Sequence, residues 1–168
     1  MRTIAMTCGA LLLAAALAHA GAIDDCNQVR DLQRQFRGCS TYLKQGSGRP
    51  EDLATAHINR ANVYARRGKY GFALRDYEAA IRRDPSNPLA FYNRGNVYFD
   101  TQQYPLAIAD FSRAIEIDPS FALAYLNRGL AHERRSDNLA AVGDYRRALE
   151  LDPSGRVAHE RLKRLQSE

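Results

Sequence analysis

The order of polar and apolar residues repeats through the middle of the chain at a fixed interval of about 34 residues. The segment 86–119 shares this pattern with the segments 52–85 and 120–153 on either side of it. Four markers keep the interval in all three copies: Asn-Arg at 59–60, 93–94 and 127–128, Ala at 73, 107 and 141, Asp at 76, 110 and 144, and Asp-Pro at 84–85, 118–119 and 152–153. A fixed period of this length indicates a solenoid whose units stack side by side.

Each copy of the pattern predicts a pair of helices, and the three repeats span 52–85, 86–119 and 120–153. We expect the helices at 53–66 and 70–83, at 89–101 and 105–117, and at 122–134 and 139–151. The Asp-Pro steps separate one pair from the next, because the residue before proline is disfavoured in a helix and proline begins the next segment. The turns within the pairs are marked by Gly68, Gln102-Gln103 and Ser136-Asp137.

Further helices are expected at both ends of the repeats. A helix from about 29 to 44 is predicted by apolar residues at three- and four-residue intervals: Val29, Leu32, Phe36, Cys39 and Leu43. Residues 46–50 follow as a linker. Residues 154–168 are expected to form a capping helix, because they combine an apolar face with the polar outer face that the end of a solenoid requires. A frayed tail is the alternative.

Residues 1–20 resemble a secretory signal peptide that is removed from the mature chain. Arg2 precedes an apolar run at 4–18, and Ala18-His19-Ala20 has the small-x-small form of a signal-peptidase site. The mature chain is therefore expected to begin near residue 21 and to hold no transmembrane segment. An uncleaved membrane anchor is the alternative, although the run is shorter than the ~20 residues that a membrane span needs.

Export makes a disulfide between Cys26 and Cys39 the expected state of these residues. Cys8 lies in the apolar run and leaves with it, so an even pair remains in an oxidising compartment. Two unpaired small side chains are the alternative. A straight helix through both cysteines would hold them ~20 Å apart, whereas a disulfide needs Cα atoms within ~7 Å. The chain must therefore bend at 27–30, and the bridge would pin the N-terminal segment 21–49 over the end of the solenoid.

The repeated unit is similar to the tetratricopeptide repeat (TPR), a helix-turn-helix unit of about 34 residues. The middle copy carries the large, small and aromatic positions of the motif at Phe91, Gly95, Tyr98, Ala107, Phe111, Ala114 and Pro119. The other copies depart from it at His57, Ala61 and His132. The resemblance implies an all-α fold, a right-handed α-solenoid of three TPR helix pairs with an N-terminal helix and a C-terminal capping helix, whose TPR domain spans 50–168.

The repeated arginine and aspartate depart from the commonest TPR pattern. We hypothesise that the arginines pair with the aspartates, within a repeat or between neighbours: Arg60, Arg94 and Arg128 with Asp76, Asp110 and Asp144. Partly buried pairs of this kind fix the register of helices more than they add stability.

The TPR resemblance implies a concave groove lined by the first helix of each pair, with two stripes of candidate peptide-binding residues. One stripe carries side-chain amides, which suit a peptide backbone because each has a donor and an acceptor: Asn59, Asn93 and Asn127, with Asn62 and Asn96 beside them. The other stripe is apolar: Ile58, Tyr92, Phe99, Leu126 and Leu130. One interpretation is an extended or helical peptide in this groove. The other is that these side chains only satisfy and pack against neighbouring helices.

Some TPR proteins hold a C-terminal carboxylate in a clamp of basic residues. Carried over by position, Asn62 and Asn93 match that clamp. Lysine or arginine is absent from the three positions where the clamp needs a cation: Ile58, Leu123 and Asn127. A carboxylate clamp is therefore not expected here.

The charge balance changes this picture little. The formal net charge is +5, from 24 basic and 19 acidic residues. This excess mildly favours acidic partners and is too small to indicate nucleic-acid binding. Arginine doublets at 66–67, 82–83, 134–135 and 146–147 are candidate anion sites. Three of the four lie near predicted helix C-termini, where the helix dipole favours cations that simply stay solvated.

The sequence carries no motif of an enzyme or of a cofactor site. It has no phosphate-binding loop, nucleophile elbow or HExxH, and its histidines lack metal-ligand spacing. We expect a non-catalytic scaffold of the cell envelope, periplasmic or secreted like the exported bacterial TPR proteins it resembles, that binds a protein or peptide partner and needs no cofactor. The alternative is a structural or self-assembling module that docks electrostatically on acidic envelope components. Salt would weaken such docking, whereas an apolar groove interaction would survive it. The oligomeric state is left open.

Overall fold

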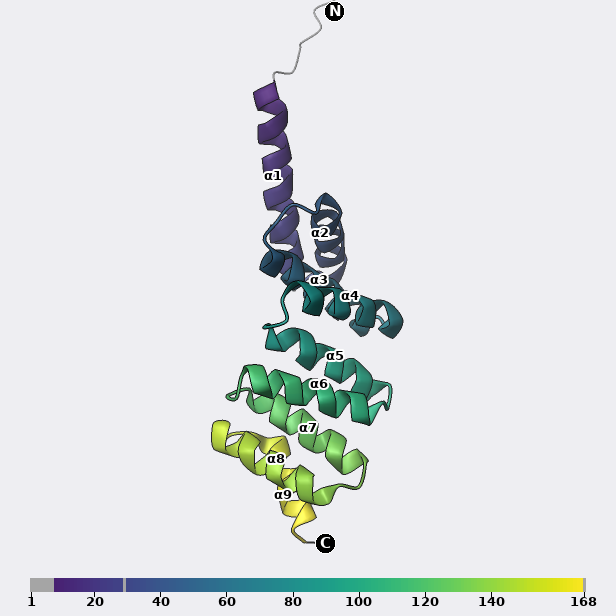
Figure 1. The fold of residues 1–168 in the computed structure, drawn as a ribbon, viewed down its shortest axis with the longest axis vertical. Coiled ribbons are helices and arrows are strands. Elements are labelled where there is room, and N and C mark those ends of the chain that lie inside the picture. The colour runs from purple at the N-terminus through teal and green to yellow at the C-terminus, as the bar shows by residue number, and fades with distance from the viewer. Residues whose placement is uncertain (1–7, 29, 168) are drawn as a thin grey trace, which may run out of the picture.

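The computed structural model describes residues 8–28 and 30–167, and the side chains of these residues from 18 onward. All regular secondary structure in these ranges is helical (Figure 1): α1 (Cys8–Asn27), α2 (Leu32–Gln45), α3 (Pro50–Arg66), α4 (Tyr70–Arg83), α5 (Pro88–Asp100), α6 (Tyr104–Ile117), α7 (Ala122–Arg134), α8 (Asn138–Leu151) and α9 (Arg156–Leu165). The expected all-α class is confirmed. Among the described helices, none combines the length and the apolar character that crossing a membrane requires.

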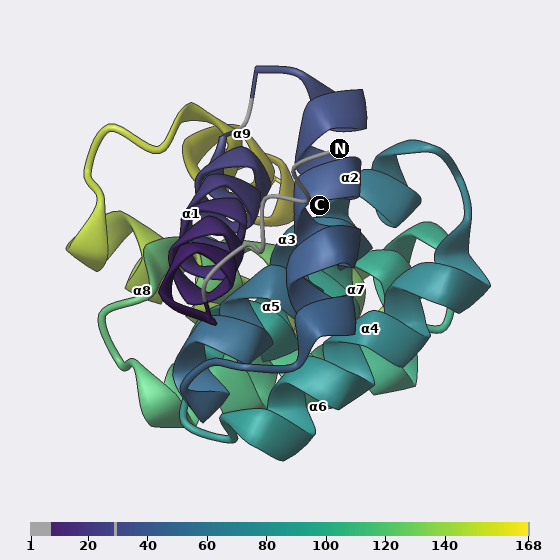
Figure 2. The ribbon, with the colours of Figure 1, turned by 90° about the horizontal axis from the view of Figure 1, so that it is seen from above.

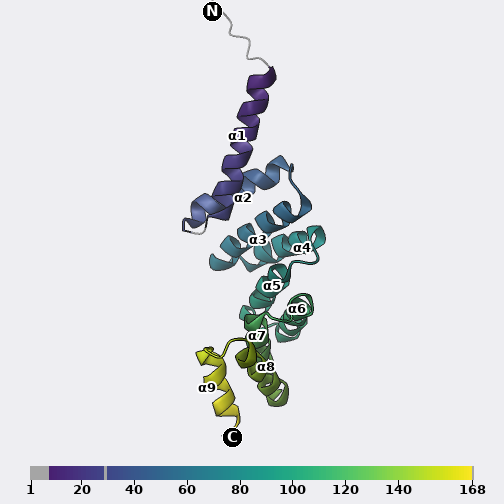
Figure 3. The same ribbon diagram turned by 90° about the vertical axis from the view of Figure 1, so that its left-hand side faces the viewer.

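The helices pack as consecutive pairs that stack along one axis (Figures 1 and 3). The three repeats are α3 with α4, α5 with α6, and α7 with α8, and the first helix of each repeat also contacts the first helix of the next. α1 packs on α2 ahead of the repeats, and α9 packs on α8 behind them. Seen from above, the pairs lie over one another around the long axis (Figure 2). The predicted solenoid of three helix pairs with helices at both ends is confirmed.

The segment before the repeats holds two helices in place of the single helix expected. α1 continues without a break past residue 20, so the expected signal-peptidase site lies inside a helix, and α2 begins at Leu32 and not near 29. The side chain of Gln28 closes the loop between them, because its oxygen accepts hydrogen bonds from the backbone N–H groups of Arg30 and Asp31. The carboxylate of Asp31 then caps α2 by accepting from the next two free N–H groups at 2.8 and 3.0 Å. Signal cleavage stays a prediction.

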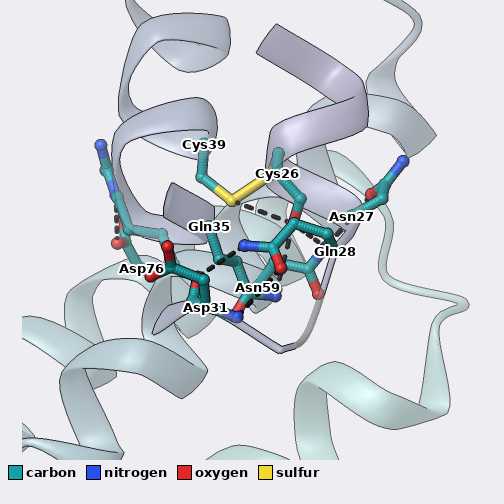
Figure 4. Close-up of a disulfide and its surroundings, with 9 residues drawn as sticks. Cys26, Asn27, Gln28, Asp31, Gln35, Cys39, Asn59 and Asp76 are labelled. Atoms are coloured by element: carbon teal, nitrogen blue, oxygen red, sulfur yellow. Dashed lines mark hydrogen bonds and ion pairs between the residues drawn. A yellow bond between two sulfur atoms is a disulfide. The ribbon is translucent and has the colours of Figure 1, made fainter. Parts of the chain in front are cut away.

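The expected disulfide joins Cys26 of α1 to Cys39 of α2, with an S–S distance of 2.12 Å and Cα atoms 4.4 Å apart (Figure 4). Both cysteines are fully buried. Because α1 ends at Asn27 and α2 begins at Leu32, the chain reverses between the cysteines, as the bend predicted at 27–30 requires.

Gly38 allows α1 and α2 to approach this closely. A Cβ atom on Gly38 would lie 2.5 Å from Cβ of Asp25 and 2.6 Å from the backbone nitrogen of Cys26. A larger residue therefore cannot be accommodated unless the backbone of α1 moves. Nothing in the sequence pattern marks this position, because a lone glycine inside a helical segment only lowers the helix propensity.

A small residue on the first helix meets an aromatic ring on the second in each repeat. A Cβ atom on Gly95 would lie 2.8 Å from the ring of Phe111, and one on Gly129 would lie 2.8 Å from the ring of Tyr145. In the first repeat Ala61 shares a core cluster with Tyr77, and both are buried. The motif positions read from the sequence therefore form the contact between the two helices of a repeat, where small side chains permit close packing.

One buried arginine–aspartate pair joins the two helices of every repeat. The arginines donate from Nε and Nη2 to both carboxylate oxygens at 2.7–2.9 Å: Arg60 to Asp76, Arg94 to Asp110, and Arg128 to Asp144. The three aspartates are only 6–7% exposed. The hypothesised pairing is confirmed, and it lies within a repeat.

The pair in the first repeat has an additional partner, His57. Its Nδ1 atom lies 2.9 Å from Oδ1 of Asp76. Burial alone would raise the pKa of Asp76, but the hydrogen bonds from Arg60 and His57 outweigh burial and lower the pKa. The hydrogen bond to Asp76 in turn raises the pKa of Arg60. The folded state therefore favours the ionised pair.

Replacing Asp110 by alanine should lower the free energy of unfolding by ~3–5 kcal/mol, because Arg94, whose side chain is only 19% exposed, is left without its partner. Urea unfolding at neutral pH, followed by circular dichroism, measures this loss. The control is the double variant Arg94→Met/Asp110→Leu, which removes both charges and should recover most of the stability. A single variant as stable as the wild type would refute the structural role of the pair.

Lowering the pH should reduce the free energy of unfolding of the wild-type protein more than that of an Asp76→Asn variant. The pKa of Asp76 is lowered in the folded state. The ionised carboxylate therefore contributes stability above its unfolded pKa of ~3.9, and this contribution disappears as the pH falls through the folded value. Unfolding free energies measured from about pH 6 to about pH 2.5 should fall more steeply for the wild type. Parallel curves for the two proteins would contradict this assignment.

Replacing Gly38 by alanine should separate α1 from α2, because the new Cβ overlaps the backbone of α1. We expect a loss of ~1–3 kcal/mol in stability and a fraction of chains with free Cys26 and Cys39 thiols, detected by alkylation and mass spectrometry. Gly143→Ala is the matched control, since Gly143 is a helical glycine with open space around it. A Gly38→Ala protein that is fully oxidised and as stable as the wild type would show that the close approach is unimportant.

Candidate functional site

Two hollows adjoin on the surface formed by the first helices of the repeats. The first, of ≈ 250 Å³, lies between α3 and α5 and is lined by Asn62, Ala65, Arg66, Tyr77, Asn93, Asn96, Val97 and Asp100. The second, of ≈ 400 Å³, lies between α5 and α7 and is lined by Asn96, Phe99, Asp100, Asn127 and Leu130. Because Asn96 and Asp100 border both hollows, the two form one groove across α5, which we call the central groove.

Side-chain amides with unused hydrogen-bonding groups line the central groove. The amide of Asn93 makes no hydrogen bond to any other residue that the structure describes. The oxygen of Asn62 accepts from the hydroxyl of Tyr77 at 2.6 Å, and the oxygen of Asn96 accepts from Nδ2 of Asn127 at 2.8 Å. The NH₂ groups of Asn62 and Asn96 have no acceptor in this part of the chain. The groove can therefore donate hydrogen bonds at three places.

Asn59, the first residue of the amide stripe, is bonded to the chain itself. Nδ2 of Asn59 donates to the carbonyl oxygen of Cys26 at 3.2 Å and to Oδ1 of Asn27 at 3.2 Å, at the C-terminal end of α1 (Figure 4). Asn59 thus satisfies a carbonyl group that the end of a helix leaves unpaired. The structure places this predicted site residue at the junction of α1 with α3, outside the central groove.

Asn127, the last residue of the amide stripe, uses part of its hydrogen-bonding capacity within the chain. Its Nδ2 atom donates to the hydroxyl of Tyr92 at 3.1 Å and to the oxygen of Asn96. Asn127 still borders the second hollow. In the middle repeat, by contrast, Asn93 keeps its whole amide available.

The apolar candidate Ile58 is a core residue. It is only 5% exposed and belongs to a core cluster that includes Ala90 and Val97 of α5. Its position in the repeat predicted a surface location, but the packing of the second repeat on the first covers it. Ile58 is therefore not available to a ligand.

The remaining apolar candidates are half buried. Tyr92 packs against the rings of Phe111 and Phe121, with centroids 5.9 and 4.7 Å away. Phe99 meets the ring of Tyr104 edge-on at 5.5 Å and borders the second hollow. Leu126 and Leu130 pack against the cluster that contains Ala158 of α9, and Leu130 also borders the second hollow. Phe99 and Leu130 are thus the apolar candidates that the structure brings to the central groove.

Glu133 lies in the last turn of α7, the first helix of the third repeat. Its carboxylate accepts hydrogen bonds from the hydroxyl of Tyr145 at 2.9 Å, from Arg161 at 3.2 Å and from Arg164. Burial raises the pKa of Tyr145, and the hydrogen bond to Glu133 raises it further. These bonds fasten α9 to α7. The repeat pattern places Glu133 on the concave face of the third copy but gives no sign of Arg161 and Arg164, because both arginines lie outside the repeat.

The central groove also has charged residues, which the repeat pattern places on the concave face but which were not among the peptide-binding residues expected. Arg66 and Asp100 border the hollows and are exposed. They occupy the same position in consecutive repeats, and Arg134 takes this position in the third, with its guanidinium 5.6 Å from the ring of Phe99. This recurring position at the end of each first helix is the signal that places them on the concave face.

The central groove offers hydrogen bonding and apolar contact. In the described part of the chain, no group of three or more His, Cys, Asp or Glu side chains is arranged to hold a metal ion. The groups that face the groove are mainly amides, aromatic and apolar side chains, and two charges of opposite sign. Such a surface suits recognition of a polypeptide segment.

Sequence models of TPR repeats match the repeated region. A model described as "TPR repeat" matches residues 61–102 and 95–136, and one described as "Tetratricopeptide repeat" matches residues 118–156. No curated protein sequence matches the chain significantly. The sequence models therefore agree with the repeats seen in the structure.

Solved structures of TPR proteins share the fold. The first TPR domain of Spaghetti (RPAP3), bound to the HSP90 peptide SRMEEVD, is 30% identical with a TM-score of 0.68, and the match covers 70% of this chain and 93% of that one. The second TPR domain of human RPAP3, in complex with the HSP70 peptide SGPTIEEVD, is 29% identical with a TM-score of 0.68, over 71% of this chain and 99% of that one.

MamA from Desulfovibrio magneticus RS-1 is similar over more of the chain. It is 21% identical with a TM-score of 0.76, and the match covers 90% of this chain and 84% of that one, a likeness that concerns the fold alone. The repeat pattern, the matching sequence models and the 30% identity to a TPR domain all agree. This chain belongs to the tetratricopeptide repeat family.

Proposed function

We propose that this protein is a non-catalytic scaffold of the cell envelope that binds a peptide segment of a partner in the central groove. The observation that carries the proposal is the pair of adjoining hollows across α5, with unused amide groups on their border. Its relatives support it, because two TPR domains of RPAP3 are bound to peptides. TPR folds are typically non-catalytic interaction modules.

The chemistry of the groove favours an uncharged peptide with an apolar side chain. A peptide backbone presents one N–H and one C=O at each residue, and the free amide of Asn93 can bond to both. Asn96 offers a further donor beside it. Phe99 and Leu130 supply apolar surface in the second hollow, where a side chain of the ligand gains free energy by leaving water.

The ligand is an internal segment of its protein and not a free C-terminal carboxylate. The three positions at which a clamp would need cations hold Ile58 in the core, the apolar Leu123, and Asn127 bonded to Tyr92. At the border of the groove the charge of Arg66 is offset by Asp100. A terminal carboxylate would therefore find no surplus of positive charge.

The envelope location is part of this proposal. It rests on the signal-like residues 1–20 and on the cysteine pair, because a buried disulfide between Cys26 and Cys39 persists in an oxidising compartment. A protein exported to the periplasm or secreted would keep this bond and the attachment of α1 to α2. The partner would then be another protein of the envelope.

Replacing Asn93 by alanine should weaken peptide binding about tenfold, the equivalent of roughly one hydrogen bond. Peptides selected on the wild-type chain from a random library, measured by fluorescence anisotropy, provide the ligands. Asn59→Ala is the matched control, because Asn59 occupies the same repeat position but is bonded to α1. It should leave the affinity unchanged. Equal affinities of the wild type and the Asn93→Ala variant would exclude the central groove as the site.

The HSP90 peptide SRMEEVD distinguishes an internal segment from a free carboxylate in the same assay. It should bind no more tightly than ~1 mM, since the clamp cations are replaced. Submicromolar binding of this peptide would overturn the proposed selectivity.

A further inference from the structure

Three large apolar side chains stand exposed along one edge of the solenoid. Phe72 is 53% exposed, Leu106 is 46% exposed and Leu139 is 87% exposed. Each lies in the first turn of the second helix of its repeat, in α4, α6 and α8 respectively. The turns that precede these helices follow one another down the edge at the right of Figure 1. We call this row the apolar edge.

The apolar edge is one of two sets of exposed hydrophobic residues. In the described part of the chain six large hydrophobic side chains are exposed, and three of them form this row. The other three are Leu89 and Leu123, at the starts of first helices, and Val157 on α9. Leu89, Leu123 and Val157 keep the 34-residue interval of the repeats. Leu139 lies one position before Ala140, the equivalent of Phe72 and Leu106. Single exposed apolar side chains are ordinary on a protein surface, so the feature that distinguishes the apolar edge is its charge.

Exposed cations accompany the apolar edge. The turns at 66–70 and 134–138 carry five exposed basic residues: Arg66, Arg67, Lys69, Arg134 and Arg135. Asp100 and Asp137 are the exposed acids of the three turns. The guanidinium of Arg75 lies 5.7 Å from the ring of Phe72. Tyr70 and Tyr104 begin α4 and α6 at the same edge. Apolar groups, tyrosines and flanking cations together are typical of surfaces that lie on an anionic membrane.

We infer that the apolar edge docks on an anionic lipid surface, with Phe72, Leu106 and Leu139 entering the interfacial layer and the cations of the turns lying at the headgroups. A lipid surface accepts single side chains that do not form a continuous patch. A specific protein partner requires a continuous patch of ~800 Å² on each side, and polar Gln102 and Gln103 interrupt this row. The apolar edge therefore suits lipid better than an acidic protein.

The absence of tryptophan from the sequence allows a probe to be placed on this edge alone. Phe72→Trp in the full chain reports insertion at α4. Val157→Trp, at an exposed position after the turn on the opposite edge, is the matched control. Both are mixed with vesicles of phosphatidylcholine alone or with added phosphatidylglycerol, using lipids brominated on the acyl chains as quenchers. The apolar run at 4–18 can bind vesicles in either variant, so quenching and not sedimentation is the readout.

On anionic vesicles alone, the fluorescence emission of the Phe72→Trp chain should shift to shorter wavelength and be quenched by the brominated lipid. The emission of the Val157→Trp chain should do neither. Adding Lys69→Gln and Arg135→Gln to the Phe72→Trp chain should weaken its partition from water onto anionic vesicles about tenfold. No shift at position 72, or equal quenching at both positions, would overturn the inference. Binding of soluble polyglutamate with the same dependence on the two cations, and no quenching by brominated lipid, would assign the edge to an acidic protein instead.

Discussion

The buried arginine–aspartate pair is the interaction on which the geometry of the repeats depends. It joins the two helices at the same place three times, with two hydrogen bonds that fix both the distance and the rotation between them. A buried carboxylate that loses its cation is strongly destabilising, so alternative registers of the helices are penalised. The first helices consequently present equivalent faces to one side, and the central groove lies where α5 meets its two neighbours.

The period of the sequence predicted the helix pairs and the ion pairs because each depends on contacts that recur at the same two positions in every copy. It could not predict contacts with segments outside the repeat. Asn59 and Asn93 are equivalent in the pattern, yet the side-chain amide of Asn59 is bonded to the end of α1. The side-chain amide of Asn93 bonds to no other residue that the structure describes. Gly38 carries no periodic signal, although it determines how closely α1 approaches α2. The pattern also predicted a surface position for Ile58, but the next repeat covers this residue.

The two ends of the solenoid are closed by different chemistry. At the N-terminal end a covalent bond and a glycine contact hold α1 against α2, and the carbonyl group of Cys26 near the end of α1 takes the amide of Asn59. At the C-terminal end the carboxylate of Glu133 holds α9 through two arginines. Both closures use polar groups of the terminal repeats. The middle repeat keeps its hydrogen-bonding capacity, which explains why the central groove is centred on α5.

The central groove and the apolar edge meet at one repeated position, occupied by Arg66, Asp100 and Arg134. Each residue ends a first helix and precedes the turn that leads to the edge. On an anionic surface the two arginines would lie near headgroup phosphates, and their charge would be less available to a ligand in the groove. The carboxylate of Asp100, which borders both hollows, would then dominate the local potential. Docking on lipid would thus make the groove less favourable for anionic peptides and more favourable for neutral or cationic ones. This preference agrees with the missing carboxylate clamp.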